Sequence, residues 1–246
     1  MIAAAPSTKR LYWDEADCFE TDAIVVAQDQ DRIACDRTCF YPGGGGQPAD
    51  RGVVCLAGGV VLEILGAQAD ASAVIWHLTK PAPPAGIVGA PVRLTLDRER
   101  RVALARYHTV LHVLDTIALF EHGAWITGVQ IGAEYSRIDF KLEQLSAALR
   151  VDLESKVNAV LMRDCRVTAH YIPESEFGTR QDLLRTLEAK PPIIDGQVRV
   201  VQIEGFDAQA CGGTHVSRTS QVGRFSILRT ENKGKINKRL YVQLKQ

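Results

Sequence analysis

The sequence predicts an α+β protein of two domains, a small N-terminal β-barrel followed by a larger domain that mixes helices with antiparallel strands. The first observation behind this prediction is length, because 246 residues can bury a full core and fit one large or two modest domains. The second is that short β-rich runs fill the chain up to about residue 96. The third is that a long run of helical periodicity begins at residue 98. We therefore expect domains at residues 1–94 and 95–246.

The first domain contains six short runs rich in β-branched and apolar residues, separated by breaks rich in Gly, Pro, Asp and Ala. Six short strands at this spacing predict a small barrel. His77 lies in one of these runs without a partner at a useful spacing, so we expect a structural histidine with satisfied ring nitrogens. The runs are 23–27, 32–35, 52–56, 60–65, 73–78 and 91–96.

A glycine-rich connection, Phe40–Gly52, interrupts these strands and contains four consecutive glycines at 43–46. It is not a phosphate-binding P-loop, because no Gly-Lys-Ser/Thr follows and no helix opens after it. Four glycines carry a large ordering entropy, which is useful where backbone must approach another group closely. Gln47 is the polar side chain that such a loop could present to a ligand. On composition alone, a flexible linker is the alternative.

The second domain opens with a helix, for which Asp97 is the expected N-cap and which runs from Arg98 to about Phe120. His108 and His112 lie four residues apart on it, so both could aim a ring nitrogen at one metal ion. Alone, this spacing is weak evidence for a metal site, since histidines on a partly apolar helix are more often core or surface residues.

A second pair of metal-binding residue types lies near the end of the chain, in Cys211-Gly212-Gly213-Thr214-His215. The diglycine suits a tight loop that turns a thiolate and an imidazole onto one ion. Two His/Cys pairs from distant parts of the chain match the ligand set that zinc prefers. We therefore expect about one Zn²⁺ per chain, held by His108, His112, Cys211 and His215, and the alternative is four unrelated residues.

The remaining elements of the second domain mix helices and strands. We expect a β-hairpin, a helix capped by Ser146, further strands and a short helical stretch, with a basic turn between the last two strands. In chain order, these are strands 125–132 and 135–140, the helix to about 163, strand 166–172, the helical stretch 181–187, strands 198–203 and 223–228, the turn 232–239 and strand 239–244.

Composition gives few indications of a partner or compartment. Lys+Arg and Asp+Glu are both 29, so the net charge of zero does not predict a nucleic-acid partner and local patches must carry that argument. Two basic patches could meet phosphates or be only solvated faces. The patches are Arg98, Arg101 and Arg106 on the first helix, and Lys233, Lys235, Lys238 and Arg239 near the last turn.

No apolar run approaches a membrane span, the start does not resemble a secretory signal, and six cysteines are too few for a disulfide scaffold, so we expect a cytoplasmic protein.

Three segments together resemble the alanyl-tRNA editing family, the free-standing AlaX proteins related to the editing domain of alanyl-tRNA synthetase. They are Tyr41–Gly52, Arg106–His112 and Ala210–His215, and the resemblance covers nearly the whole chain. The glycine motif and the length resemble the medium-sized class, which has an N-terminal barrel and lacks the C-terminal domain of the longest class.

This resemblance implies an aminoacyl-tRNA deacylase that removes serine, and in part glycine, from the tRNA for alanine. The family's zinc positions fall on His108, His112, Cys211 and His215, its glycine-motif glutamine falls on Gln47, and its reader of the serine hydroxyl falls on Thr127. The implied partner is therefore mischarged tRNA, and no obligatory protein partner is evident.

The chemistry of ester hydrolysis leaves alternatives open. The substrate ester is already activated, so hydrolysis requires a positioned water and a group that polarises or orients the ester. No Glu lies between His108 and His112, which disfavours peptide hydrolysis. Four protein ligands would make the zinc site closed and structural, whereas three plus water would make it open and catalytic. A zinc-stabilised RNA-binding module without hydrolytic activity and an editing enzyme for another aminoacyl-tRNA are the rival functions.

Overall fold

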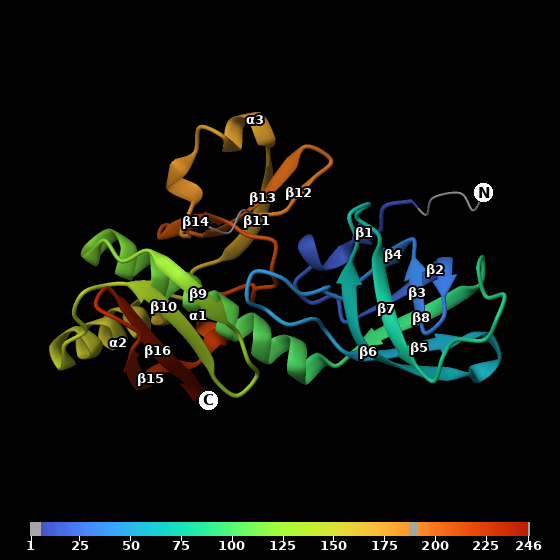
Figure 1. Ribbon diagram of the computed structural model, residues 1–246, viewed down its shortest axis with the longest axis horizontal. Coiled ribbons are helices and arrows are strands. Elements are labelled where there is room, and N and C mark those ends of the chain that lie inside the picture. The colour runs from blue at the N-terminus through green and yellow to red at the C-terminus, as the bar shows by residue number, and fades with distance from the viewer. Residues whose placement is uncertain (1–5, 187–190, 246) are drawn as a thin grey trace. The chain divides into compact units, whose positions relative to one another are not determined.

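The computed structural model describes residues 6–186 and 191–245, which form two compact units (Figure 1). The first unit comprises the described residues up to Gly44 together with Pro48–Arg101, and the second comprises Gly45–Gln47 together with the described residues from Val102 onward. The tip of the glycine loop therefore belongs to the second unit. Within the described residues, no helix is long and apolar enough to cross a membrane.

The first unit is a closed six-stranded barrel, which confirms the predicted fold of this part. Every neighbouring pair of its strands is antiparallel. The short parallel pair β1 (Lys9–Arg10) and β4 (Arg37–Thr38) was not predicted. Around the barrel the strands follow the order β2 (Glu20–Asp29), β3 (Arg32–Cys35), β7 (Ile75–Lys80), β6 (Val61–Ala69), β5 (Gly52–Leu56) and β8 (Pro91–Leu96).

Alternating residues of these strands fill the barrel. Ile33, Val54, Ile64 and Leu94 are fully buried, as expected when side chains on successive strand residues point to opposite faces. Gly52 is needed where β5 meets β8, because a Cβ there would lie 2.2 Å from the Thr95 carbonyl oxygen. The strand pattern thus determines both the barrel and its core.

The second unit is built around helix α1 (Arg98–His122), whose first four residues belong to the first unit. Asp97 caps it as predicted, since its carboxylate accepts a hydrogen bond from the Arg100 amide at 3.0 Å. α1 packs through its apolar residues on a four-stranded antiparallel sheet and on α2 (Ala147–Met162), which is capped by Ser146. The sheet has the order β15 (Arg224–Asn232), β16 (Asn237–Lys245), β10 (Ser136–Lys141) and β9 (Ile126–Gln130).

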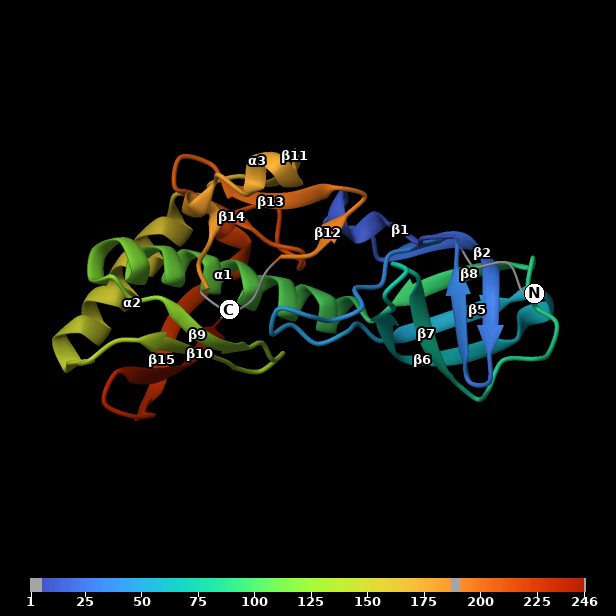
Figure 2. The same cartoon turned by 45° about the horizontal axis from the view of Figure 1, so that its top comes forward.

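A second sheet lies on the other side of α1 (Figure 2). Its strand β14 carries the chain to Cys211. The predicted helical stretch 181–187 is only a 3-10 turn at Gln181–Leu183, and Leu187 lies outside the described residues. α3 (Glu174–Phe177) precedes that turn, and Thr219–Val222 forms another. The sheet pairs β11 (Val167–Pro173), β12 (Ile193–Ile194) and β14 (Asp207–Ala210) with β13 (Gln197–Ile203).

The predicted basic turn is shorter than the sequence indicated. Asn232 pairs with Lys238 across β15 and β16, so only residues 233–236 form the turn and Lys238 and Arg239 lie in a strand. Cross-strand pairing extends these strands beyond their apolar part, which the hydrophobic pattern does not reveal.

Candidate metal centre

Four side chains from two distant segments converge in the second unit. His108, His112, Cys211 and His215 each offer one ligand atom, and these four atoms all lie within 4.8 Å of one another. Helical spacing on α1 brings the His108 and His112 rings to a centroid separation of 5.1 Å. The loop after β14 adds Cys211 and His215. The structure therefore brings together all four predicted metal ligands.

The loop requires glycine at position 213 for a steric reason. A Cβ on Gly213 would lie 2.2 Å from Cε1 and 2.4 Å from Nδ1 of His108. The loop backbone thus passes directly against the histidine ring, and any side chain at this position would displace it. The diglycine predicted to permit a tight loop also permits this close approach.

Hydrogen bonds fix the orientation of two of the histidine rings. His108 Nδ1 lies 2.7 Å from the Gln47 side-chain oxygen, which can only accept, so His108 carries its proton on Nδ1. Thr109 donates its hydroxyl to the Ala105 carbonyl and therefore accepts from His215 Nδ1 at 3.2 Å. In both rings Nε2 keeps its lone pair. Such partners on the second ring nitrogen are typical of metal-ligating histidines.

The free Nε2 atoms face the cysteine sulfur. Cys211 Sγ lies 3.5 Å from His108 Nε2 and 3.4 Å from His215 Nε2. In a tetrahedral zinc site, Zn–S bonds of about 2.3 Å and Zn–N bonds of about 2.0 Å place sulfur and nitrogen roughly 3.5 Å apart. These two sulfur–nitrogen pairs are thus spaced as in a tetrahedral zinc site, and the four residue types present fit the metal.

Burial keeps the three imidazoles in the neutral form that binds metal. Desolvation, reinforced by the nearby Arg199 cation, lowers the pKa of His108 to about 3, and burial also lowers the pKa values of His112 and His215 well below the usual range. All three imidazoles are therefore neutral near pH 7. Burial raises the pKa of Cys211, and Arg199 opposes that rise.

Gln47 lies at this centre and is only 2% exposed. Its side-chain oxygen accepts from His108 Nδ1 and from the Thr214 amide at 3.1 Å, and its nitrogen donates to the Thr214 hydroxyl at 2.8 Å. The glutamine therefore ties the helix to the Cys211–His215 loop. The sequence predicted that Gln47 would contact substrate, and the structure shows protein partners for it at both ends of the amide.

The glycine loop is an ordered turn rather than a flexible linker. Gly45 and Gly46 have φ values of +55° and +83°, which favour glycine. A Cβ on Gly46 would lie 2.7 Å from the Val129 carbonyl oxygen, and the Gly46 carbonyl accepts from the Ile131 amide at 2.8 Å. The backbone approaches β9 closely, and this approach delivers Gln47 to His108.

Thr127 lies apart from this arrangement. It is exposed on β9, and its hydroxyl donates to the Asn237 side-chain oxygen at 3.0 Å. Its neighbour Ile126 packs in the core beside α1, and no hydrogen bond among the described residues joins Thr127 to the four ligands. Its role as a hydroxyl reader stays a prediction.

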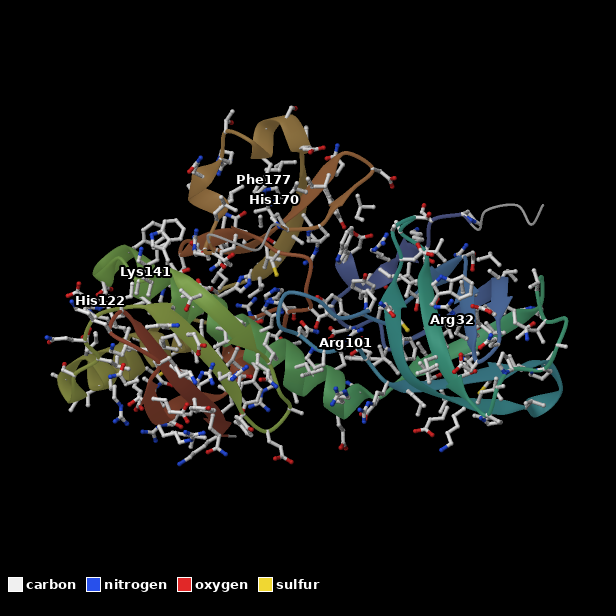
Figure 3. The ribbon with its side chains drawn as sticks, viewed as in Figure 1. Arg32, Arg101, His122, Lys141, His170 and Phe177 are labelled. Atoms are coloured by element: carbon white, nitrogen blue, oxygen red, sulfur yellow. The ribbon has the colours of Figure 1, made fainter. Side chains whose placement is uncertain are left out.

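The predicted phosphate-binding residues of α1 fall into different environments. Arg101, which is labelled in Figure 3, is 1% exposed. It pairs with Asp50 through bonds of 3.0 and 3.1 Å from Nε and donates to the Cys39 carbonyl. A guanidinium enclosed in this way is a structural group of the barrel unit. Arg98 is exposed, and Arg106 is half-buried with Nε donating to the Val222 carbonyl at 2.9 Å.

The residues near the last turn divide in the same way. Lys233 and Lys235 are exposed. Lys238 is 8% exposed and donates to the carbonyls of Gly234 and Lys235, while Arg239 forms a two-bond ion pair with Asp139, both bonds 2.7 Å long. Lys238 thus closes the turn and Arg239 is neutralised within the sheet, so the exposed cations of this predicted patch are Lys233 and Lys235.

Sequence reasoning did not identify three residues that support the centre. Thr109 orients His215, Gln209 donates to the His112 carbonyl at 3.1 Å and to Asp115 at 2.6 Å, and Arg199 donates to the Cys211 carbonyl at 3.0 Å. Only Thr109 had a local signal, because it adjoins His108 in the motif. The other two reach the centre from β13 and β14, and their spacing from the ligands carries no pattern.

Comparison with known proteins gives a consistent result. The family model described as "Threonyl and Alanyl tRNA synthetase second additional domain" matches residues 198–241. The alanyl-tRNA editing protein AlaX-M of Methanosarcina acetivorans is 34% identical over 244 residues, which cover 96% of this chain and 99% of the relative. AlaX-M of Saccharolobus solfataricus is 30% identical, covering 97% of this chain and 99% of the relative. The alanine–tRNA ligase of Korarchaeum cryptofilum is 36% identical over 91% of this chain, which spans 25% of the ligase.

Proposed function

Since the chain belongs to the AlaX family of alanyl-tRNA editing proteins, which are aminoacyl-tRNA deacylases, we propose that it hydrolyses Ser-tRNA(Ala) and, in part, Gly-tRNA(Ala). The observation that carries the proposal is the ligand cluster, in which two histidine nitrogens lie 3.4 and 3.5 Å from the Cys211 sulfur. Relatives named as editing proteins share nearly the full length of the chain.

In this proposal the four residues His108, His112, Cys211 and His215 hold one zinc ion per chain. Zinc can supply a positive charge that polarises or orients the ester of the bound substrate. Four protein ligands complete a tetrahedral shell, which favours a site that shapes and charges the pocket over one that activates water directly. Gln47 and Thr109 keep Nε2 of His108 and His215 directed at the cluster.

We propose that tRNA phosphates contact the predicted cations that remain exposed or half-buried. These are Arg98 and Arg106 on α1, with Lys233 and Lys235 at the turn. The enclosed Arg101, Lys238 and Arg239 act through the fold, since each already has protein partners. Thr127 is proposed as the reader of the serine hydroxyl on the strength of the sequence resemblance.

A deacylation panel tests the function. The purified chain is incubated with Ser-tRNA(Ala), Gly-tRNA(Ala), Ala-tRNA(Ala) and a serine-charged tRNA for serine, and the ester remaining is measured with time. We expect the fastest loss from Ser-tRNA(Ala) and little from Ala-tRNA(Ala). Binding of all four without hydrolysis would instead support the zinc-stabilised RNA-binding module. Hydrolysis confined to an aminoacyl-tRNA outside the alanine set would support a different editing specificity.

A further inference from the structure

Arg199 is a buried cation of the second unit whose role the proposed function leaves unexplained. It lies on β13 and is 6% exposed. Its Nη1 donates to two carbonyls of the Cys211–His215 loop, that of Cys211 at 3.0 Å and that of Gly213 at 2.9 Å. The Arg199 carbonyl in turn accepts from the Cys211 amide at 3.0 Å. One residue therefore holds the loop at both sides of Gly212.

The loop requires such a restraint because of its composition. Gly213 allows the tight path against His108, and Gly212 and Gly213 together give the unrestrained segment many competing conformations. Fixing the backbone of each residue costs conformational entropy. Hydrogen bonds from a charged donor are stronger than those between neutral groups, so the two bonds from Arg199 offset part of that cost. The same guanidinium also interacts electrostatically with the Cys211 side chain.

We infer that Arg199 is a positioning residue of the metal centre, which holds the Cys211–Gly213 segment in its ligand-presenting conformation. Arginine suits this role because its planar guanidinium presents its donors in a rigid fork, whereas a lysine ammonium is a compact point charge on a flexible stem. The inference rests on the proposed metal centre and is independent of which aminoacyl-tRNA is hydrolysed.

The test measures binding of Co²⁺, which replaces Zn²⁺ and reports its ligands by absorption. The full chain is stripped with a chelator and titrated with Co²⁺ in competition with a chromophoric chelator. We expect the wild type to show tetrahedral cobalt bands and a thiolate charge-transfer band. Arg199→Met should weaken affinity about 10–100-fold, the cost typical of losing a group that orients a ligand, and should alter the charge-transfer band. Arg199→Lys should recover part of both.

Arg239→Met is the matched control, because it removes an arginine that is largely buried and paired with Asp139 on the other sheet of the same unit. It should leave the cobalt spectrum unchanged. An Arg199→Met chain that is folded by circular dichroism and binds Co²⁺ with wild-type affinity and spectrum would overturn the inference. If Arg199→Met does not fold, Arg199→Gln remains polar but is uncharged, and its amide nitrogen ends two bonds short of the Nη1 position that binds both carbonyls. A wild-type spectrum and affinity in Arg199→Gln would therefore overturn the inference equally.

The readout also separates this inference from the proposed function. A wild type that binds Co²⁺ tetrahedrally but deacylates none of the charged tRNAs would refute the function while leaving the role of Arg199 measurable on cobalt. A wild type that binds no Co²⁺ would remove the metal centre and the inference with it.

Discussion

Two sets of buried histidines in this chain differ in how their ring nitrogens are satisfied. His77 in the barrel has partners on both nitrogens, the Thr38 hydroxyl at 2.8 Å and the Ile33 carbonyl at 3.3 Å. In the second unit, His108 and His215 have a hydrogen-bond partner on Nδ1 that belongs to the surrounding protein, while Nε2 faces the Cys211 sulfur. Burial alone therefore does not identify a ligand. A histidine is better identified as a ligand by a ring nitrogen whose lone pair is directed at other potential ligand atoms.

The strongest test compares variants that lack predicted metal ligands of the second unit with a variant that lacks His77 of the barrel. The double variant His108→Ala/His112→Ala should reduce metal content from about one ion per chain to nearly none, because only two ligands remain. Cys211→Ala should lower metal content and affinity less completely, because three protein ligands with a water can still hold zinc. Cys211→Ala should be the most severe single change, since it also removes the thiolate charge. Deacylation should fall by more than about 100-fold, the upper cost of merely misorienting a ligand.

His77→Gln provides the control for those variants. It removes a buried histidine without touching the cluster, so metal content measured by elemental analysis should stay at the wild-type value. Full occupancy in the double histidine variant, or loss of metal in His77→Gln, would contradict the assignment of the two sets.

The next largest effect concerns pH and the barrel. Burial lowers the pKa of His77 from 6.5 to about 4, so His77 is neutral in the folded barrel at pH values where the unfolded chain already binds a proton. Its contribution to stability is complete above pH 6.5 and is lost as the pH falls toward 4. A difference of this size corresponds to about 3 kcal/mol.

The lowered pKa values of His108, His112 and His215 in the second unit also make stability depend on pH, so the measurement must be a difference. Denaturant unfolding of wild type and His77→Gln between pH 7.5 and 4 should show that the variant loses about 3 kcal/mol less free energy of unfolding across this range. Equal losses in the two chains would show that His77 does not drive the acid sensitivity of the barrel.

The sequence could predict those parts of the molecule that depend on local pattern. All six barrel strands and helix α1 were predicted because their hydrophobic periodicity is local. The ligand pairs were predictable because each spans only four residues. Gln47 and Thr214 are separated by 167 residues, and Arg101 and Asp50 by 51, so nothing near either residue indicates its partner. The exposed and enclosed arginines of α1 therefore look alike in the sequence.

The third prediction concerns Gln47, the hydrogen-bond partner of Nδ1 in His108. Gln47→Ala removes the acceptor of the His108 Nδ1 proton and should weaken zinc affinity about 10–100-fold. Gln47→Glu keeps an acceptor of the same length and should retain most of the affinity. Thr38→Ala, which removes a partner of His77 instead, should leave zinc affinity unchanged. Competition with a zinc chelator measures all three, and equal affinities in Gln47→Ala and wild type would exclude the orienting role.

The fourth prediction compares exposed lysines with a lysine that already has protein partners, and it concerns the salt dependence of tRNA binding. Each neutralised phosphate changes the salt slope of RNA binding by slightly less than one unit, so Lys233→Ala/Lys235→Ala should flatten the dependence of log Kd on log salt by about 1.5 units. Lys238→Met removes a lysine already bound to two carbonyls and should leave the slope unchanged. Filter binding of tRNA between 50 and 300 mM salt provides the measurement. A slope that responds to Lys238 alone would reverse this assignment.

The smallest expected effect is at Thr127, the predicted hydroxyl reader that is exposed and bonded to Asn237. A site that hydrogen-bonds the serine hydroxyl can reject alanine, which lacks it, so an editing enzyme needs such a group. Thr127→Val keeps the β-branched shape and removes the hydroxyl. It should lower the preference for Ser-tRNA(Ala) over Ala-tRNA(Ala) by about 1 kcal/mol, the value of one neutral hydrogen bond, while metal content stays constant.

Asn237→Ala separates this role from a purely structural one, because it removes the partner of Thr127 and leaves the threonine hydroxyl in place. If Thr127 reads substrate, Asn237→Ala should retain the wild-type ratio of the two deacylation rates and Thr127→Val should not. If both variants keep that ratio, the hydroxyl is read elsewhere. The next candidates are then Thr109 and Thr214, whose hydroxyls bond His215 and Gln47 beside the ligand cluster.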